Sequence, residues 1–169
     1  MRKVSILVLM LAALVAGSVI ADGEKKAEKK AHDYVGAKKC KTCHKAQFAS
    51  WSETGHAKAF DLLSDTEKKD PKCVGCHSTG TDVKGVFLEG VQCEACHGGG
   101  KDYKSAKIMS KKKWKADPDT HKKMAIDAGL NYPKEADCVR CHTKEGNTNF
   151  KEFDFAKRKD LVHPKVEKK

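Results

Sequence analysis

The chain has 169 residues, of which 39% are hydrophobic, 7% aromatic and 34% charged, and its formal net charge is +11. So few apolar side chains cannot bury enough surface to offset the entropy lost on folding, which excludes a fold held together by an ordinary hydrophobic core alone. The positive charge comes without interleaved aromatic residues or a nucleic-acid-binding motif, so no nucleic-acid partner is expected.

The chain begins with MRKVSILVLMLAALVAGSVIA, which has the pattern of a signal peptide. Arg2 and Lys3 form a positive head, residues 4–16 are apolar, and small residues precede a cleavage point after Ala21. The apolar run is too short for a comfortable membrane span. We expect a cleaved signal peptide at 1–21 and a location in the periplasm or outside the cell. An uncleaved anchor, which would keep the protein at a membrane surface, is the alternative.

Residues 22–31, DGEKKAEKKA, are charged and show no apolar periodicity, so they are expected to form a flexible leader. The remaining residues, 32–169, have the length of one domain.

The first half of this domain carries short structural signals. Apolar residues between 46 and 63 predict two helical stretches broken around Gly55. Residues 77–85 are turn-rich, and residues 85–93, GVFLEGVQC, predict a short extended segment.

The second half has one clear helix signal. Asp117 can cap a helix, Pro118 suits its first turn and Gly129 suits its end. Residues 101–116 are lysine-rich and ambiguous, and Pro164 ends a C-terminal stretch that contains three phenylalanines. The predicted fold is therefore mainly α and loop-rich.

One five-residue pattern, C-x-x-C-H, occurs four times and uses all eight cysteines. The motifs are CKTCH (Cys40, Cys43, His44), CVGCH (Cys73, Cys76, His77), CEACH (Cys93, Cys96, His97) and CVRCH (Cys138, Cys141, His142). Disulfides explain an even number of cysteines in an exported protein but not the histidines. Zinc knuckles need no histidine at a fixed place in every motif. Covalent c-type haem needs all three residues, because two thiols join the haem and the imidazole binds its iron. We therefore expect four c-type haems, packed together as the missing core.

The histidines outside the motifs are as numerous as the motifs. They are His32, His56, His121 and His163. This equality allows four haems with a histidine on both sides of each iron, an arrangement that suits electron transfer with little rearrangement. Methionine ligation by Met109 or Met124 is the weaker alternative, because Met124 sits near apolar Ile126 and suits core packing.

The charge balance also fits a cofactor. Without Arg2 and Lys3 the formal charge of +11 falls by two to +9. Four haems would bring about eight propionate charges, partly offset by the ferric irons, so that the oxidised protein is only mildly basic. Lysine runs are then expected to neutralise propionates and to dock redox partner proteins, whose identity the sequence does not give.

Longer segments of the sequence resemble the cytochrome c-554 family of tetrahaem proteins. They are AKKCKTCHKAQFASWSETGHAKAF, CVGCH, GVQCEACHGGG and the last CVRCH. The resemblance runs from about Val35 to His142 and implies a compact, mostly helical periplasmic fold with closely packed haems. It implies His56 opposite His97 and His163 opposite His142. The family's first haem takes a histidine shortly after the third motif, where this chain has none, so His121 or His32 must substitute.

The predicted function is electron transfer between redox partners of a respiratory chain. An enzyme is the alternative: the family keeps its second haem open, so the haem at His77 could reduce nitric oxide or a related nitrogen oxide. No catalytic acid–base constellation supports this alternative. A subunit of a conductive cytochrome filament is the third possibility, and the sequence leaves the oligomeric state open.

Overall fold

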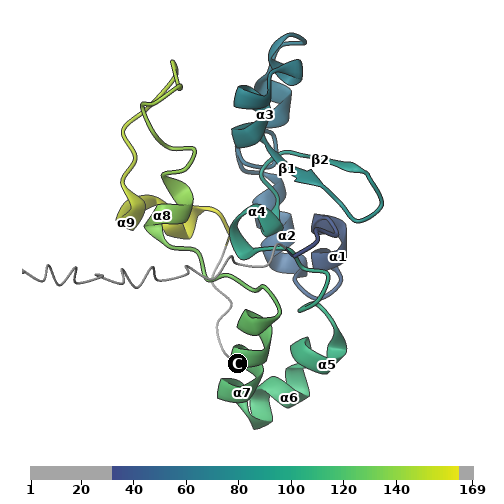
Figure 1. The fold of residues 1–169 in the computed structure, drawn as a ribbon. Coiled ribbons are helices and arrows are strands. Elements are labelled where there is room, and N and C mark those ends of the chain that lie inside the picture. Colours follow the sequence, from purple (N-terminus) through teal and green to yellow (C-terminus); the bar gives the residue numbers. More distant parts are fainter. Residues whose placement is uncertain (1–31, 164–169) are drawn as a thin grey trace, which may run out of the picture.

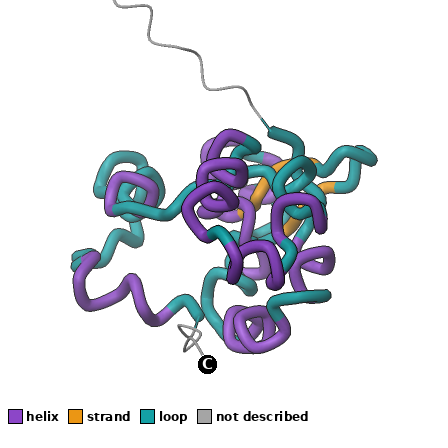
Figure 2. The backbone as a smooth tube through the Cα atoms, turned by 90° about the horizontal axis from the view of Figure 1, so that it is seen from below, coloured by secondary structure: helices purple, strands orange, loops and turns teal. Residues whose placement is uncertain are grey.

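The computed structural model of the chain describes residues 32–163 (Figure 1). The expected signal peptide and leader lie outside these residues. The helices, in chain order, are α1 (Ala37–Lys41), α2 (Lys45–Ser52), α3 (Pro71–His77), α4 (Cys93–His97), α5 (Ala106–Met109), α6 (Lys111–Ala116), α7 (Pro118–Asp127), α8 (Glu135–Cys138) and α9 (Phe155–Arg158). Figure 2 shows these short helices joined by long loops. The mainly helical, loop-rich fold class is thus confirmed.

The longest helix, α7, forms as its sequence predicts. The Asp117 carboxylate accepts a hydrogen bond from the backbone N–H of Thr120, and Pro118 occupies the first turn. Gly129 follows the helix with φ +102°, a conformation that favours glycine. The first predicted helical stretch is also found, as α2, whereas the second is only a 3₁₀ turn, Phe60–Leu62, after the break at Gly55.

A two-stranded antiparallel hairpin joins α3 to α4. Its strands are β1 (Ser78–Thr81) and β2 (Phe87–Glu89), and β2 confirms the predicted extended segment. The first strand lies in the segment predicted to be turn-rich, residues 77–85, and has no apolar alternation that would favour a strand. It is held instead by Thr79, whose buried hydroxyl donates to the Gly90 carbonyl and accepts from Gln92 N–H.

Few apolar side chains are buried within the described residues. They are Ala37, Ala59, Leu63, Leu88, Tyr103 and Ala125. Half of these are alanines, and large residues such as Leu62 and Ile126 are exposed. This observation agrees with the expectation from composition that the polypeptide supplies little core of its own. No helix between residues 32 and 163 has the length and apolar character needed to cross a bilayer.

Figure 1 shows where the motifs lie relative to the other elements. The second motif lies on α3 at one end, and α5, α6 and α7 lie together at the other. The third motif, on α4, lies between them. The segment with α8 and α9, which follows α7 in the chain, lies to one side.

Candidate haem-binding site

All four C-x-x-C-H motifs adopt a single helical turn. The second motif ends α3 and the third motif is α4. In the first and fourth motifs the histidine N–H donates to the carbonyl of the first cysteine, from His44 to Cys40 and from His142 to Cys138, both at 3.0 Å. A helical turn places residues i, i+3 and i+4 on one face, so each motif presents two thiols and an imidazole together. All eight cysteines are free thiols.

Cysteines of different motifs also meet. The thiol of Cys40 lies within hydrogen-bonding reach of Cys93, and this contact, followed by burial, raises the pKa of Cys40. Burial, followed by a hydrogen bond with Cys76, raises the pKa of Cys141 to about 12. The structure therefore brings the first motif against the third and the second against the fourth.

Two motif histidines are oriented through Nδ1. The Nδ1 of His77 lies 2.6 Å from the Ala59 carbonyl oxygen, and that of His97 lies 3.2 Å from the Asn131 carbonyl oxygen. Because a carbonyl only accepts, Nδ1 must carry the proton in each bond, and Nε2 keeps its lone pair. Metal-binding histidines are held in this way.

Two other histidines lie opposite motif histidines. The ring centroids of His56 and His142 are 6.0 Å apart, and so are those of His97 and His163. Two imidazoles on opposite sides of one metal ion have centroids about 6 Å apart, because each metal–nitrogen bond is about 2 Å and each centroid lies about 1 Å behind its nitrogen. Both distances therefore fit a histidine pair that shares one iron.

The pairing implied by the resemblance is corrected here. It placed His56 opposite His97 and His163 opposite His142, whereas the structure exchanges the partners. The cause lies in the chain path: Val91 N–H donates to the His56 carbonyl, which fixes His56 beside the segment leading into α4, while its ring reaches His142.

The remaining two histidines are held by residues that follow the third motif. His32 Nδ1 lies 3.0 Å from a carboxylate oxygen of Asp102, and its ring packs against Gly129. His121, on α7, has Nδ1 3.0 Å from the carbonyl oxygen of Ile108, in α5. Among residues 32–163, neither ring forms a ring–ring contact with His44 or His77.

The paired histidines are suited to bind metal as neutral imidazoles. Burial lowers the pKa of His56, and the nearby His142 lowers it further. Burial also lowers the pKa of His97, against the hydrogen bond that its Nδ1–H donates to the Asn131 carbonyl, and burial lowers the pKa of His142 together with the positive charge of Arg158. A neutral ring is the form that coordinates a metal.

A cavity of about 300 Å³ lies beside the second and fourth motifs. His77 and His142 both line it, with Phe150, Phe153 and Arg158. Phe153 stacks on His142, with ring centroids 4.4 Å apart and planes 14° apart, so it fixes the orientation of that ring. The wall is partly apolar and includes the cations Lys151 and Arg158, as a porphyrin with propionates requires.

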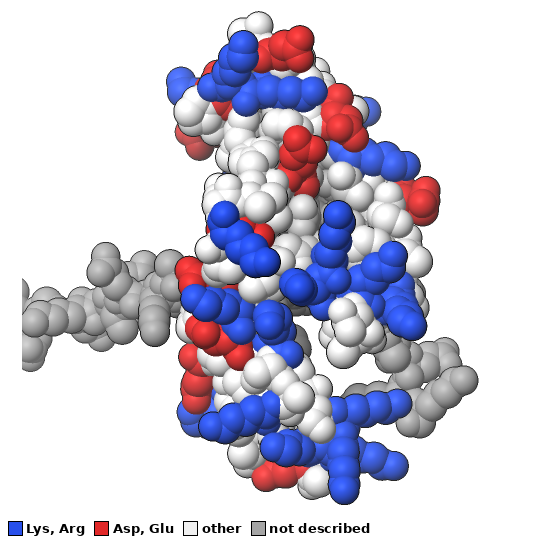
Figure 3. All heavy atoms as spheres, turned by 90° about the vertical axis from the view of Figure 1, so that its right-hand side faces the viewer, with Lys and Arg blue, Asp and Glu red and all other residues white. Residues whose placement is uncertain are grey.

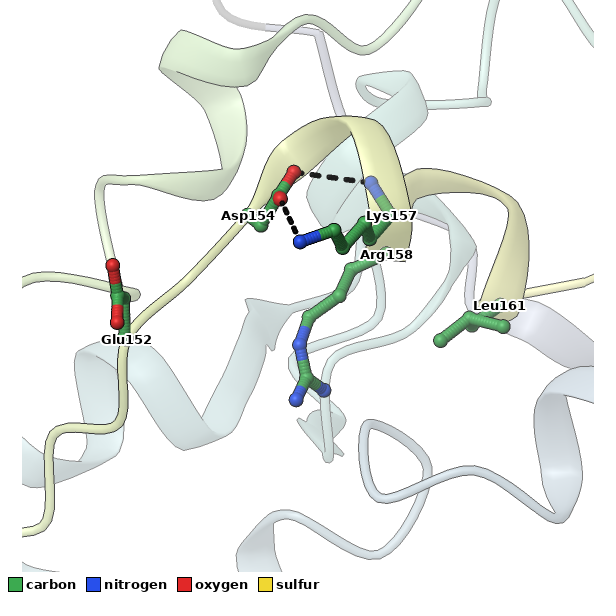
Figure 4. A pocket seen from close by; sticks show the side chains of 5 residues that line it. All are labelled: Glu152, Asp154, Lys157, Arg158 and Leu161. Atoms are coloured by element: carbon green, nitrogen blue, oxygen red, sulfur yellow. Dashed lines mark hydrogen bonds and ion pairs between the residues drawn. The ribbon is translucent and has the colours of Figure 1, made fainter.

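A second cavity, of about 440 Å³, shares Glu152 and Arg158 with the first. Figure 4 shows the Asp154 side chain bonded to both the backbone and the side chain of Lys157, while Arg158 extends away from α9. The Lys157 charge is thus paired beside its own helix, and Arg158 is the cation that lines both cavities.

Sequence reasoning missed several residues that support the motifs. Asn131 accepts from His97 through its carbonyl, while its side chain donates to the Cys96 carbonyl and to Asp137, just before the fourth motif. Glu94, inside the third motif, is buried and accepts backbone hydrogen bonds. No sequence signal marks either one, because their partners are mostly backbone groups. The donor set as a whole, paired thiols with oriented neutral imidazoles, fits covalent haem.

Comparisons with known proteins agree with this donor set. Residues 39–98 match the family described as "Cytochrome c554 and c-prime". Cytochrome c-554 of Nitrosomonas europaea is 34% identical over 134 residues, which are 64% of this chain and 57% of that protein. The chain thus spans little more than half the length of this relative.

The fold is similar to a solved structure of the reduced state of cytochrome c554 from Nitrosomonas europaea. The TM-score is 0.52 with 24% sequence identity, and the match covers 78% of each chain. The four C-x-x-C-H turns and these similarities support a relationship of the chain to the cytochrome c-554 family, whose name implies covalently bound c-type haem.

Proposed function

We propose that this protein is a periplasmic tetrahaem electron carrier that passes electrons between respiratory redox partners. The observation that carries the proposal is the presence of two histidine pairs with ring centroids 6.0 Å apart, each pair including one C-x-x-C-H histidine. Irons closed on both sides by histidine exchange electrons with little rearrangement and do not readily bind substrate.

Each motif would hold one haem through its two cysteines and histidine, and the four haems would supply one-electron chemistry. His163 would be the second ligand of the third haem and His56 that of the fourth. The contacts of Cys40 with Cys93 and of Cys76 with Cys141 favour two closely spaced haem pairs. Arg158 would bind a propionate, because guanidinium groups pair well with carboxylates.

The proposed partner is a redox protein with an acidic docking face. Figure 3 shows lysine and arginine side chains gathered over the lower part of one face, at the height of α5, α6 and α7. The lysines of α6 are exposed: Lys111, Lys112, Lys113 and Lys115. Opposed surface charges speed the encounter of two proteins and orient it.

Two measurements test the carrier function together. The mass of the denatured protein should exceed that of the chain by four haems, and the colour should survive extraction with acidic acetone. Low-temperature electron paramagnetic resonance of the ferric protein should then show mainly low-spin signals. Loss of colour on extraction would refute the haem assignment, and mainly high-spin signals would refute the carrier.

A small-molecule reductase at the second haem is the other candidate. The observation that favours it is that His32 and His121 are both held by residues after the third motif, Asp102 and Ile108, whereas His77 is held by Ala59, before the second motif. An iron bound only by His77 would be open to nitric oxide. Binding of one carbon monoxide per reduced chain would support this site, and no binding would leave a carrier alone.

A further inference from the structure

Glu94 is the least exposed charged residue in the described part of the chain. Only 1% of its surface is exposed, and it occupies the position after the first cysteine of the third motif. Burying a carboxylate is costly unless hydrogen bonds compensate for the lost water. Its environment must therefore explain why a charged side chain is tolerated there.

Backbone N–H groups surround the Glu94 carboxylate. Gly100 donates to Oε1 at 2.6 Å, Gly36 donates to Oε2 at 2.7 Å, and Val35 lies at 3.0 and 3.1 Å from the two oxygens. Among residues 32–163, the donors to this carboxylate are backbone N–H groups, and no lysine or arginine forms an ion pair with it. Because both oxygens face donors, the ionised carboxylate fits this site better than the acid, whose O–H would need an acceptor.

Glu94 lies between the first and third haem-attachment sites. Its donors Val35 and Gly36 come directly before α1, which carries Cys40, and Cys40 in turn contacts Cys93. Tyr103 is buried in the same place, and its pKa is raised first by burial and then by nearby negative charges that include Glu94. A charge at this position, away from water, acts on both attachment sites with little screening.

We infer that Glu94 is a fixed buried anion that lowers the reduction potentials of the haems attached at the first and third motifs. A negative charge stabilises the ferric iron, which carries one more positive charge than the ferrous iron. Backbone N–H groups stabilise the anion without adding a neutralising side-chain cation. This inference rests on the proposed haem attachment and makes the first and third haems the low-potential pair of the protein.

The test compares three variants by potentiometric titration of the holoprotein, with each haem resolved by magnetic resonance. Glu94→Gln removes the charge. At a fixed applied potential it is expected to raise the ferrous-to-ferric ratio of the first and third haems about tenfold, which corresponds to a rise of about 59 mV in their reduction potentials. Glu94→Asp keeps the charge and should leave these potentials close to those of the wild type. Glu89→Gln removes an exposed charge nearby and is the matched control.

These variants separate charge from packing. A merely structural role predicts that Glu94→Gln and Glu94→Asp both lower the unfolding midpoint and shift the potentials alike, and that result would overturn the inference. Unchanged potentials in Glu94→Gln would overturn it as well. Four covalent haems in all three variants would show that the proposed haem attachment stands whichever result is found.

A measurement on the wild type covers the case in which Glu94→Gln does not fold. Infrared difference spectra between oxidised and reduced protein, with ¹³C-labelled glutamate, should show an ionised carboxylate band that shifts when the low-potential pair is reduced. A band from a protonated carboxylic acid, or no glutamate band at all, would contradict a fixed anion beside these haems.

Discussion

The imidazole rings of His97 and His163 lie 6.0 Å apart, centre to centre, with their planes 28° apart, although one belongs to the third motif and the other to the C-terminal segment. With a haem at the third motif, as proposed, this relationship favours His163 as its second ligand. It also explains how the segment after α9 is retained, since few apolar side chains there are buried.

Replacing His163 by methionine tests this assignment. His163→Met should raise the potential of the third haem alone, because a thioether favours the ferrous iron more than an imidazole does. His56→Met is the matched variant and should raise only the potential of the fourth haem. Potentiometric titration with haem-resolved spectra measures both shifts. If His163→Met moved the fourth haem, the pairing implied by the family resemblance would be restored.

The second ligand of the first haem is expected to be His121. The ring projects from a capped helix and is fixed through Nδ1 by α5, in the segment that follows the third motif. His121→Ala should turn one low-spin haem high-spin and create one additional carbon monoxide site per chain.

His32→Ala is the control, because His32 is also oriented through Nδ1, by Asp102. It should leave the number of low-spin haems unchanged. A new high-spin signal in His32→Ala and none in His121→Ala would make His32 the ligand instead.

The part of the site that local chemistry determines could be predicted from the sequence. The four motifs, the cap at Asp117 and the end of α7 at Gly129 depend on residues close in the chain, and the structure has them as expected. The histidine pairs depend on how distant loops pack. Neither the Ala59 carbonyl that holds His77 nor the Asn131 carbonyl that holds His97 leaves a signal in side-chain identity. The pairing was therefore wrong when inferred from resemblance alone.

Gly90 is expected to control the position of His56. Its φ is +73°, and a Cβ there would lie 2.6 Å from the Ala57 carbonyl oxygen and 3.1 Å from that of His56. Gly90→Ala should cost about 1–2 kcal/mol for the backbone conformation alone, with a further cost for the contact with Ala57. It should also broaden the signal of the fourth haem in paramagnetic resonance, because His56 must shift.

Gly85→Ala isolates the backbone contribution. Gly85 has φ +79°, but its Cβ would meet no atom within 4 Å. Denaturant unfolding of the two holoproteins should show a larger loss for Gly90→Ala, and a change in the fourth haem only there. Equal losses with unchanged haem spectra would remove Gly90 from the support of His56.

If His121 binds the first haem, the cap of α7 should make the ligation of that haem sensitive to acid. Hydrogen bonds from Thr120 lower the pKa of Asp117. A lowered pKa contributes stability that is complete above the ordinary range of an aspartate and is lost as the pH falls through the folded-state value. Carbon monoxide binding at the first haem should therefore rise in acid as α7 frays. Asp117→Asn keeps a capping side chain without the charge, so its binding should not follow the same acid titration.

Removal of single haems should show that the third motif organises the fold and the fourth does not. The side chains of Gln92 and Glu94, in the third-motif segment, accept hydrogen bonds from the backbone N–H groups of residues 35–37. The His97 carbonyl also accepts one from the Asn131 backbone N–H. The fourth motif lies in the lateral segment with α8 and α9 (Figure 1).

Since the polypeptide buries few apolar side chains, losing the central haem should unfold its neighbours as well. Circular dichroism of the double variant Cys93→Ser/Cys96→Ser should thus show a larger loss of helix than that of Cys138→Ser/Cys141→Ser. Both variants should keep three haems by mass, and an equal loss of helix would mean that the haems contribute to stability independently of their place in the fold.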